Sequence, residues 1–490
     1  MKNLKEILQG VDVNNIIGET DKNIKGVYLD SREVSKDSIF FAVKGTLTDG
    51  HLFINKAIEN GATVIFCEKI PEENLTKGIT YIRIENMQKN MAIAVSNFYD
   101  NPSKAIKLIG VTGTNGKTTI ATLLYQLMMK MDKKSGLLST VENKIGEETL
   151  KSTHTTPDVI KLNELLKKMK EAGCEYAFME VSSHAIDQGR TEDLDFDIAI
   201  FTNITHDHLD YHGNFKNYIN TKKKFFDNLK PESFALTNID DTNGMVMVQN
   251  SKANIRTYSV RQMADYKAKI LQNSILGLHL KINGDEIFFK LRGEFNAYNL
   301  LAVYGTMHLL GFDKMETLVQ MSNLNPVTGR FDIIPNKENT IFAIIDYAHT
   351  PDALKNILST LVNIKKKEAK IITVFGAGGD RDKSKRPKMG KIAARLSDTV
   401  IVTSDNPRTE DPGDIINDIV AGIDHKAKEK VLEIEDRRQA IKTAIKLADK
   451  NDLIVIAGKG HEDYQEINGK KFPFSDKEVV KNIWYKDINR

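Results

Sequence analysis

A glycine-rich turn ending in Gly-Lys-Thr is the segment of this sequence best suited to chemistry. It spans residues 110–119 and reads GVTGTNGKTT. The apolar run before it, 106–111, predicts a buried strand, and residues 120–131 after it favour a helix. Backbone N–H groups of such a turn can surround phosphate oxygens, and the helix N-terminus adds positive potential. We therefore predict a triphosphate-binding loop, with a glycine-rich turn that binds nothing as the alternative.

The side chains of this loop have separable expected roles. Lys117 can reach the terminal phosphates of ATP, and the Thr118 hydroxyl can ligate Mg²⁺. The residues expected to bind ATP here are Gly113, Thr114, Asn115, Gly116, Lys117, Thr118 and Thr119. Val111 stands where the common G-x4-G-K-[ST] pattern has its first glycine. The loop is therefore a variant, and such variants are typical of particular families.

Acidic and imidazole side chains follow two further apolar runs. Glu180 ends the first run, where NTPases place a metal ligand near the phosphate loop. The second run leads into residues 202–212, which contain three histidines and two aspartates. Zinc is the usual metal for histidines, but the adjacent phosphate loop favours Mg²⁺. We predict that Glu180 and His208 hold metal; a helix cap or salt bridge, and a solvated loop, are the alternatives.

The arrangement of apolar runs predicts an α/β protein of several domains. A chain of 490 residues suggests about three domains. Residues 1–102 contain strand-like runs at 39–43 and 63–67 and a helix at 87–99, and a hinge follows at 101–103. Residues 103–331 contain strands at 106–111, 176–181 and 198–202. Residues 332–490 contain strands at 341–345, 371–375, 399–403 and 453–457 and a helix at 351–363. Because polar clusters follow these strands, we predict parallel sheets with ligands at the carboxyl ends of the strands.

The amino-acid composition argues against several classes of binding partner. Lys and Arg total 69 against 66 Asp and Glu, a net charge of +3, which argues against a nucleic-acid partner. The two cysteines lack metal-ligand spacing, and residues 1–5 lack the apolar core of a signal peptide. No apolar run is long enough to span a membrane. We expect a cytoplasmic monomer that acts on small molecules, with no membrane partner.

Six motifs together resemble the ATP-dependent Mur ligases of peptidoglycan synthesis. They are TGTNGKTT at 112–119, MEVSSH at 179–184, DHLDYH at 207–212, FNAYN at 295–299, GRFD at 329–332 and DYAHTP at 346–351. The resemblance implies an N-terminal α/β domain for a uridine nucleotide, a central P-loop ATPase domain and a C-terminal Rossmann-like domain for an amino acid. It also implies that ATP converts a carboxylate to an acyl phosphate, which an amine attacks to form an amide.

The same resemblance implies further roles around ATP. Thr118 and Glu180 would hold one Mg²⁺ and His208 a second. Lys222 would be carbamylated to N6-carboxylysine, although Lys223 and Lys224 follow it directly and register alone chooses among them. The expected ATP-side contacts are Asn296, Arg330, Asp346 and His349. A helix surface or a hinge salt bridge is the alternative for each of these four.

Other segments resemble the substrate sites of the family. Ser31 and His51 would bind the uridine nucleotide. The residues expected to hold the muramoyl peptide are Thr155, Thr156, Ser182, Gln188 and Arg190. These segments match the members that extend UDP-N-acetylmuramoyl-L-alanyl-D-glutamate by a third residue.

The sequence Asp405-Asn406-Pro407-Arg408 resembles the members that add meso-diaminopimelate. Arg408 can bind the distal carboxylate of that diamino acid bidentately, whereas lysine has no such group. Arg381, Gly458 and Glu462 complete the expected amino-acid site, with Glu462 taking the distal ammonium. An ordinary turn, or a member that adds L-lysine, is the alternative.

Three rival functions differ more widely. A folylpolyglutamate-type ligase shares the acyl-phosphate route, but it has no need of residues 405–408 or of a uridine-type domain. A P-loop switch or motor does not need the histidine-rich segment 202–212. A non-catalytic scaffold would be expected to have lost Lys117, Glu180 and His208, and all three are present.

Overall fold

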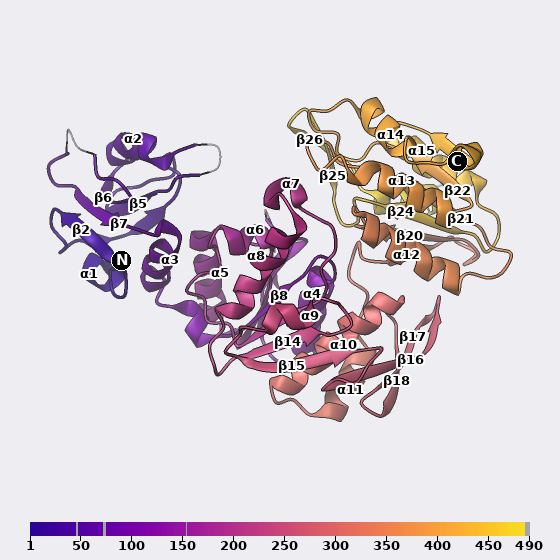
Figure 1. Ribbon diagram of the computed structural model, residues 1–490, viewed down its shortest axis with the longest axis horizontal. Helices are drawn as coiled ribbons and strands as arrows, with labels where there is room; N and C mark the ends of the chain where they lie inside the picture. The colour runs from indigo at the N-terminus through magenta and orange to yellow at the C-terminus, as the bar shows by residue number, and fades with distance from the viewer. Residues whose placement is uncertain (46–47, 72–74, 153, 486–490) are drawn as a thin grey trace. The chain divides into compact units, whose positions relative to one another are not determined.

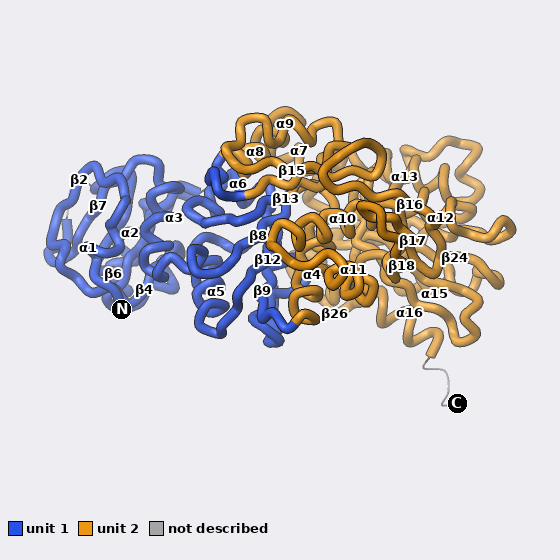
Figure 2. Tube along the Cα trace, turned by 90° about the horizontal axis from the view of Figure 1, so that it is seen from below, with its two compact units in different colours: residues 1–112, 132–199, 228–233 blue, residues 113–131, 200–227, 234–490 orange. Residues whose placement is uncertain are grey.

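The computed structural model describes residues 1–45, 48–71, 75–152 and 154–485. The chain divides into two compact units, shown in Figure 2. Unit 1 comprises residues 1–112, 132–199 and 228–233, and unit 2 comprises residues 113–131, 200–227 and 234–490. Each unit contains part of the predicted central domain, so the boundaries at 102/103 and 331/332 stay predictions. The last five residues of the predicted C-terminal domain, 486–490, lie outside the described residues.

The N-terminal part of unit 1 is a five-stranded sheet with short helices (Figure 1). Its strand order is β2-β7-β6-β5-β4, with β2 antiparallel to β7 and the other pairs parallel. The strands are β2 (Val13–Ile17), β4 (Gly26–Tyr28), β5 (Ser38–Ala42), β6 (Ala62–Cys67) and β7 (Thr80–Ile84); β1 (Lys2–Asn3) and β3 (Asn23–Ile24) pair separately. The helices are α1 (Leu4–Ile7), α2 (Ile54–Glu59) and α3 (Met87–Phe98). All of β5 is buried because two apolar clusters cover its two faces.

A second set of strands in unit 1 leads to the glycine-rich loop. Its order is β11-β10-β9-β12-β8, in which β8 is parallel to β12. The strands are β8 (Lys107–Thr112), β9 (Ser135–Leu138), β10 (Glu142–Ile145), β11 (Glu148–Lys151) and β12 (Tyr176–Glu180); the helices are α5 (Val159–Glu171) and α6 (Ser183–Asp187). Val111 lies opposite Glu180 in the β8–β12 pair. Val111 is completely buried, so the position where the common loop pattern has glycine is here part of a strand.

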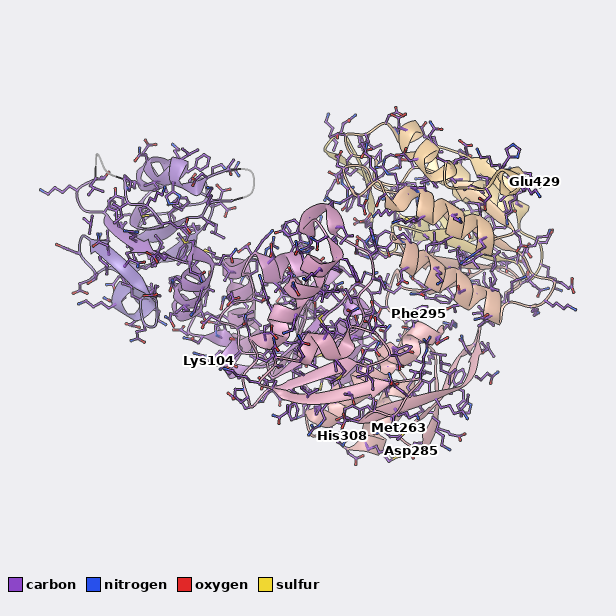
Figure 3. All side chains as sticks on the ribbon, viewed as in Figure 1. Lys104, Met263, Asp285, Phe295, His308 and Glu429 are labelled. Atoms are coloured by element: carbon purple, nitrogen blue, oxygen red, sulfur yellow. The ribbon has the colours of Figure 1, made fainter. Side chains whose placement is uncertain are left out.

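Unit 2 begins at Gly113, within the glycine-rich loop, and includes a mixed sheet. The sheet order is β14-β15-β16-β17-β18, and the helix α10 packs against β14, β15, β16 and β17. The strands are β14 (Phe234–Asn238), β15 (Asn254–Ser259), β16 (Tyr266–Ser274), β17 (Gly277–Ile282) and β18 (Asp285–Phe289); β13 (Ile198–Phe201) has residues in both units. The helices are α4 (Lys117–Lys130), α7 (Leu209–His212), α8 (Phe215–Asp227), α9 (Gly244–Val248), α10 (Glu294–Leu309) and α11 (Lys314–Ser322). Figure 3 labels Phe295 and His308 near the two ends of α10.

The strands β16, β17 and β18 are antiparallel, unlike the parallel sheet predicted for this region. Asn283 and Gly284 form the two-residue turn between β17 and β18, and both have positive φ. An Asn-Gly turn of this kind joins adjacent antiparallel strands because its twist matches theirs. The dipeptide was therefore a sequence signal for the hairpin.

The C-terminal sheet of unit 2 is covered by helices on both faces. Its order is β19-β20-β24-β21-β22-β23, with β19 antiparallel to β20 and the remaining pairs parallel. The strands are β19 (Asp332–Pro335), β20 (Phe342–Asp346), β21 (Ile371–Phe375), β22 (Thr399–Val402), β23 (Val431–Glu433) and β24 (Leu453–Ala457); β25 (Tyr464–Ile467) and β26 (Lys470–Pro473) form a hairpin. The helices are α12 (Pro351–Ile364), α13 (Lys385–Leu396), α14 (Pro412–Val420), α15 (Arg437–Leu447) and α16 (Asp476–Tyr485).

Alternation of side chains along these strands explains their continuous apolar sequence. Ile371 and Phe375 of β21 join the cluster of α12, α13 and α14, whereas Ile372 and Val374 join the cluster of α15 and α16. Figure 1 shows α12 and α13 lying across β20, β24 and β21. Because both faces are buried, polar residues collect only after the strands end. Asp346 ends β20, and Asp405 and Gly458 follow β22 and β24.

No helix among the described residues is both long and apolar enough to cross a membrane.

Replacement of Asp476 by alanine is expected to destabilise the C-terminal part of unit 2. Asp476 and Arg437 are completely buried and form a two-pronged ion pair with N–O distances of 2.8 Å. Removing the carboxylate leaves the charge of Arg437 buried without its partner, which costs about 3–5 kcal/mol. Urea unfolding followed by fluorescence measures the loss, because the single tryptophan, Trp484, lies on α16 with Asp476.

The matched control is Glu429→Ala, which removes an exposed carboxylate labelled in Figure 3. This variant is expected to change the free energy of unfolding by less than about 0.5 kcal/mol. An Asp476→Ala protein that unfolds at the same urea concentration as the control would contradict the importance of the buried pair.

Candidate functional site

The glycine-rich loop is held in a conformation that requires glycine at two positions. Gly113 and Gly116 have φ angles of +147° and +91°. A Cβ atom on Gly113 would overlap the Thr202 hydroxyl, and one on Gly116 would lie 2.7 Å from the Asn299 side chain. The helix α4 then begins at Lys117 with no side chain capping its N-terminus. The first N–H groups of α4 are therefore suited to an anionic ligand.

The segment after β13 forms hydrogen bonds to the glycine-rich loop. The Thr202 hydroxyl donates to the Asn115 carbonyl at 2.6 Å, and the Asn115 N–H donates to the Asn203 side chain at 3.0 Å. The Thr205 N–H donates to the Thr114 hydroxyl at 3.0 Å. The start of the predicted histidine-rich segment thus holds the loop in place through these hydrogen bonds.

Two lysines converge on one backbone carbonyl of the loop. The Nζ atoms of Lys117 and Lys222 lie 2.9 and 3.0 Å from the Gly113 oxygen. Lys222 is buried, and loss of solvation together with the nearby charge of Lys117 lowers its pKa well below the usual lysine value. A lowered pKa favours the neutral amine, which is the nucleophilic form of lysine.

The phase of α8 separates the three consecutive lysines. Lys222 points to the loop, Lys223 forms an ion pair with Asp227, and Lys224 is exposed. The structure therefore places only the first of the three lysines against the glycine-rich loop. Modification of Lys222 stays a prediction.

Arg330 reaches from the start of the C-terminal region to the phosphate loop. Its Nη2 donates to the Thr118 hydroxyl at 3.0 Å, and its guanidinium stacks 4.5 Å from the centre of the Tyr347 ring. Its Nε is buried and has no hydrogen-bond partner among the described residues. The Arg330 guanidinium therefore places a positive charge beside the first turn of α4.

A small pocket with both polar and apolar walls adjoins this arginine. It is lined by Thr119, Leu291, Arg292, Asn296, Pro326, Val327, Arg330 and Phe331. Thr119, Asn296 and Arg330 were each predicted to contact ATP, and the structure brings these three residues together.

Asp346 and His349 lie after β20 and are held by backbone groups. The Phe331 N–H donates to Asp346 at 2.7 Å, and loss of solvation raises the pKa of this carboxyl. The Nδ1 atom of His349 lies 2.9 Å from the Tyr347 carbonyl oxygen. Loss of solvation and the charge of Lys385 lower the pKa of His349 to about 4, so its ring is neutral at neutral pH.

The histidine-rich segment contains one imidazole–carboxylate contact between sequence neighbours and one with a residue far along the chain. His208 lies 3.4 Å from Asp207, and His206 lies 3.3 Å from Asp382. Burial alone would raise the pKa of Asp207, but His208 and other nearby cations hold it below the usual value. Within the described residues, no three His, Cys, Asp or Glu side chains are grouped so that they could hold a metal ion. A preformed zinc-type cluster is therefore absent from this part of the chain.

In unit 1, Glu180 lies among residues predicted to hold the muramoyl peptide. The Thr140 N–H donates to a Glu180 carboxylate oxygen at 2.7 Å, and the Thr156 hydroxyl donates to the Glu180 carbonyl at 2.8 Å. Thr140 also donates to the Thr155 hydroxyl at 3.1 Å. The Ser182 N–H donates to the Thr156 hydroxyl at 3.1 Å.

Arg190 joins this group through two contacts. It donates to the Thr156 carbonyl at 2.8 Å and to the Gln188 side chain at 2.6 Å. The predicted peptide-site residues of unit 1 therefore form one hydrogen-bonded cluster. The segments after β11 and after β12 meet there, although they are more than twenty residues apart in sequence, because both strands end at the same edge of the sheet.

The predicted uridine-site residues lie in the N-terminal sheet of unit 1. Ser31 is buried, and its carbonyl accepts a hydrogen bond from Asn60 at 2.8 Å. His51 lies 2.7 Å from Asp49, and its other ring nitrogen accepts the Glu68 N–H at 3.2 Å. No described hydrogen bond joins Ser31 to His51. Each is fixed locally.

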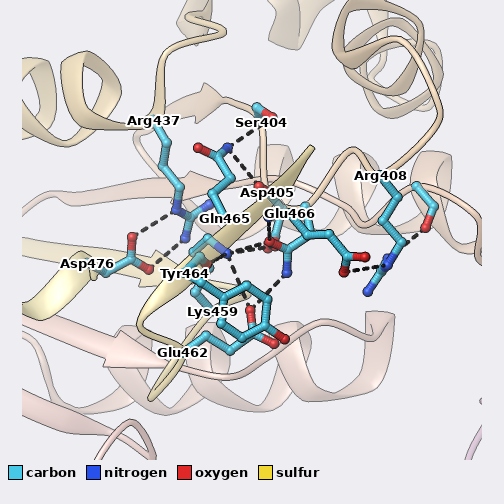
Figure 4. A network of polar contacts seen from close by, with 12 residues as sticks. Ser404, Asp405, Arg408, Arg437, Lys459, Glu462, Tyr464, Gln465, Glu466 and Asp476 are labelled. Carbon is cyan, nitrogen blue, oxygen red and sulfur yellow. Dashed lines mark hydrogen bonds and ion pairs between the residues drawn. The ribbon is translucent and has the colours of Figure 1, made fainter. Parts of the chain in front are cut away.

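The predicted amino-acid site forms one polar network at the ends of β22 and β24 (Figure 4). Asn406 donates to Glu462 at 2.9 Å, although the two residues are far apart in sequence. Arg408 has a positive φ of +52°; its Nη1 donates to the Gly379 carbonyl at 2.7 Å and its Nε lies 3.4 Å from Glu466. These contacts engage two of the three guanidinium nitrogens and leave Nη2 without a partner among the described residues.

The remaining predicted members lie around this network. Gly458 has a φ of +117°, and a Cβ there would overlap the Asp405 carboxylate. A Cβ on Gly379 would likewise overlap the Pro407 carbonyl oxygen. Arg381 contacts only the Asp380 carbonyl among the described residues, at 3.5 Å, so the structure does not bring it into the network.

Sequence reasoning missed several residues that complete these sites. Lys459 is completely buried at the centre of the amino-acid network. Arg437 donates a hydrogen bond to the carbonyl of Ala457, at the end of β24. Asp352 accepts a hydrogen bond from the Asn115 side chain at 3.1 Å. Lys459 lies between the predicted residues Gly458 and Glu462, which was a signal, whereas nothing local in the sequence pointed to Asp352 or Arg437.

Comparison with family models identifies three matching segments. A model described as "Mur ligase family, catalytic domain" matches residues 23–99, "Mur ligase middle domain" matches 111–307, and "Mur ligase, glutamate ligase domain" matches 329–460. The matches cover well over half of the sequence. The chain belongs to the Mur ligase family. This confirms the resemblance seen in the six motifs and the prediction of a ligase.

Similar Mur ligases extend over the whole chain. The UDP-N-acetylmuramoyl-L-alanyl-D-glutamate--2,6-diaminopimelate ligase of Bacteroides fragilis is 52% identical over 98% of this chain and 99% of its own. The protein of the same name from Phocaeicola vulgatus is 51% identical over the same shares. A solved structure of a ligase with this name has a TM-score of 0.70 and 33% identity, and it covers 98% of both chains. The predicted three-domain α/β architecture is that of the Mur ligase fold.

Replacement of Gly113 by alanine is expected to raise the KM for ATP at least about tenfold, because the new Cβ overlaps Thr202 and forces the loop away from its brace. Initial-rate kinetics with ATP varied measure this effect. Gly173→Ala is the control, because Gly173 has a similarly positive φ but no atom within 4 Å of the new Cβ. An unchanged KM in Gly113→Ala would show that the loop conformation is not needed for ATP.

Proposed function

We propose that this Mur ligase joins meso-diaminopimelate to the D-glutamate carboxylate of UDP-N-acetylmuramoyl-L-alanyl-D-glutamate, with cleavage of ATP. The observation that carries the proposal is the network around Asp405, Asn406, Arg408 and Glu462, which follows the carboxyl ends of β22 and β24. It offers an arginine for a carboxylate and carboxylates for an ammonium. A diamino acid with two amino-acid heads has both groups at its far end.

The chemistry begins with activation of a carboxylate. A glutamate carboxylate oxygen attacks the terminal phosphorus of ATP, which forms an acyl phosphate and releases ADP. Lys117 and the N–H groups at the start of α4 position the phosphates, and Arg330 approaches from the other side through Thr118. Thr119, Asn296 and Arg330 line one small pocket, which supports their proposed contact with ATP.

The second step forms the amide. The amine nitrogen of the diamino acid attacks the acyl carbon, the C–O bond to phosphate breaks, and the nitrogen loses a proton to solvent or a nearby base. Binding of the far end of the diamino acid in the network after β22 and β24 would direct its other amine toward the acyl phosphate.

The residues present suit Mg²⁺ better than a softer metal. The Thr118 hydroxyl and the Glu180 carboxylate are oxygen donors, which Mg²⁺ prefers, and His208 offers one imidazole. When bound, Mg²⁺ would neutralise charge on the transferred phosphoryl group. The proposal also includes a cytoplasmic monomer that acts on these small molecules alone.

A coupled assay for phosphate release tests the proposed reaction. It contains ATP and the muramoyl dipeptide, and compares meso-diaminopimelate, L-lysine and L-ornithine. We expect turnover with meso-diaminopimelate, and mass spectrometry should detect the amide product. Preferential use of L-lysine would favour the lysine-adding alternative, and turnover with a folate in place of the dipeptide would favour the folylpolyglutamate-type ligase.

In the same assay, Arg408→Ala is expected to lose most of the preference for meso-diaminopimelate over L-lysine. The variant removes the group proposed to bind the distal carboxylate, a loss of about 1.5–3 kcal/mol in the difference between the two substrates. Arg395→Ala is the control, because Arg395 lies in the same region on α13. Unchanged selectivity in Arg408→Ala would rule out this role.

We also propose that Lys222 is carbamylated, since its buried neutral amine can attack CO2, forming an N–C bond and releasing a proton. Lys222→Ala should lose nearly all activity, and bicarbonate should stimulate wild type that has been depleted of CO2. Lys224→Ala, on the exposed side of α8, is the control and should keep both activity and stimulation. Full activity of Lys222→Ala without bicarbonate dependence would exclude the modification.

A further inference from the structure

Lys459 lies where four groups of the amino-acid network meet, and it was assigned no role above. Its Nζ lies 2.8 Å from the Asn406 side-chain oxygen, 3.3 Å from Glu462 and 2.7 Å from the Tyr464 carbonyl oxygen. The Asp405 carboxylate is 3.6 Å away. The lysine is completely buried, so its charge is balanced by these groups and not by water.

The other ionic groups of the network are largely paired with one another. Arg437 forms its two-pronged ion pair with Asp476, and Arg408 faces Glu466. Lys459 is therefore the cation closest to both remaining carboxylates, Asp405 and Glu462 (Figure 4). A further cation, Lys385 at the start of α13, faces Asp405 but also Asp207 and Asp382. Ionised Asp405 and Glu462 can bind the ammonium at the far end of the diamino acid, while Arg408 binds its carboxylate.

We infer that Lys459 is a positioning residue that holds Asp405, Asn406 and Glu462 in place and keeps the pocket at the charge that selects an ammonium group of the incoming diamino acid. The inference rests on the proposed function and adds a specificity-determining residue to it.

The acid–base properties of the two carboxylates agree with this role. Burial alone would raise the pKa of Asp405, but Lys459 and Arg437 hold it below the usual aspartate value. The pKa of Glu462 is raised by burial and by the charge of Asp405, and Lys459 opposes that rise. Without Lys459, both carboxyl groups would become harder to ionise.

Charged or titratable groups from other elements also face these carboxylates. They are His349 after β20, Tyr347 beside it, Lys385 at the start of α13, Arg408 after β22 and Tyr464 on β25. His349 is neutral above about pH 4. Lys385 also faces Asp207 and Asp382. None of these groups contacts both Asp405 and Glu462 as Lys459 does in the described contacts.

The test is the pH dependence of kcat/KM for meso-diaminopimelate in Lys459→Met. The substrate ammonium needs ionised carboxylates, and loss of the lysine charge raises their pKa. The acid limb of the profile should therefore move to higher pH by about one unit or more. The KM for meso-diaminopimelate at the wild-type optimum should rise at least about tenfold, while the KM for ATP should change less than about twofold, since the ATP pocket is lined by other residues.

Two further variants separate charge from packing. Lys459→Gln keeps a hydrogen-bond donor for Asn406 and Tyr464 but removes the charge, so it should fold even where methionine does not and should show the same shift of the acid limb. Lys471→Met removes an exposed lysine whose Nζ lies 4.1 Å from the centre of the Tyr464 ring. This variant should leave the pH dependence of kcat/KM unchanged. Thermal melting of each variant confirms folding.

The outcomes are distinguishable. A wild type that forms no amide with meso-diaminopimelate overturns the proposed function and this inference with it. An active wild type whose acid limb stays in place in folded Lys459→Gln and Lys459→Met overturns the inference alone, even if both variants are less stable, because a packing role would not move the limb.

Discussion

Burial of parallel strands on both faces is the constraint on which the C-terminal region of this Mur ligase depends. A strand covered on both sides can carry polar groups only where it ends. In β21, alternate side chains pack into two separate apolar clusters, so no position within the strand is available for a polar functional side chain. Asp346, Gly458 and Asp405 lie at the carboxyl ends of β20, β24 and β22, which are parallel strands of one sheet, and consequently lie along one edge of it. The amino-acid network is a product of that geometry.

Buried charge is the second theme of the sites. Lys117 and Lys222 share the Gly113 carbonyl, and Lys459 is surrounded by carboxylates, a side-chain amide and a carbonyl. Water contributes little at such positions, so neighbouring protein groups decide the ionisation state. Burial and the nearby charge of Lys117 lower the pKa of Lys222, whereas the charge of Lys459 opposes the effect of burial on the pKa of Asp405 and Glu462. The same residue type is thus placed in two different electrostatic environments.

Much of this could be predicted from the sequence, and the failures have physical causes. The strands 371–375 and 453–457 were predicted with their observed bounds, because a fully buried strand is a continuous apolar run between polar ends. The antiparallel β16–β18 hairpins were not expected, although Asn283-Gly284 marked one turn. Arg437 was missed because its partner, Asp476, is distant in sequence and no local pattern records a long-range ion pair.

The sequence by itself determined the family and the strand, glycine-rich loop and helix at residues 107–130, because these depend on local order: motifs of a few residues, and a glycine pattern with a strand before it and a helix after it. Only the tertiary structure decided which lysine of residues 222–224 faces the loop, since helix phase turns each side chain in a different direction. Only it brought Asn406 to Glu462 and placed Lys459 between them, because strand order sets which distant loops become neighbours.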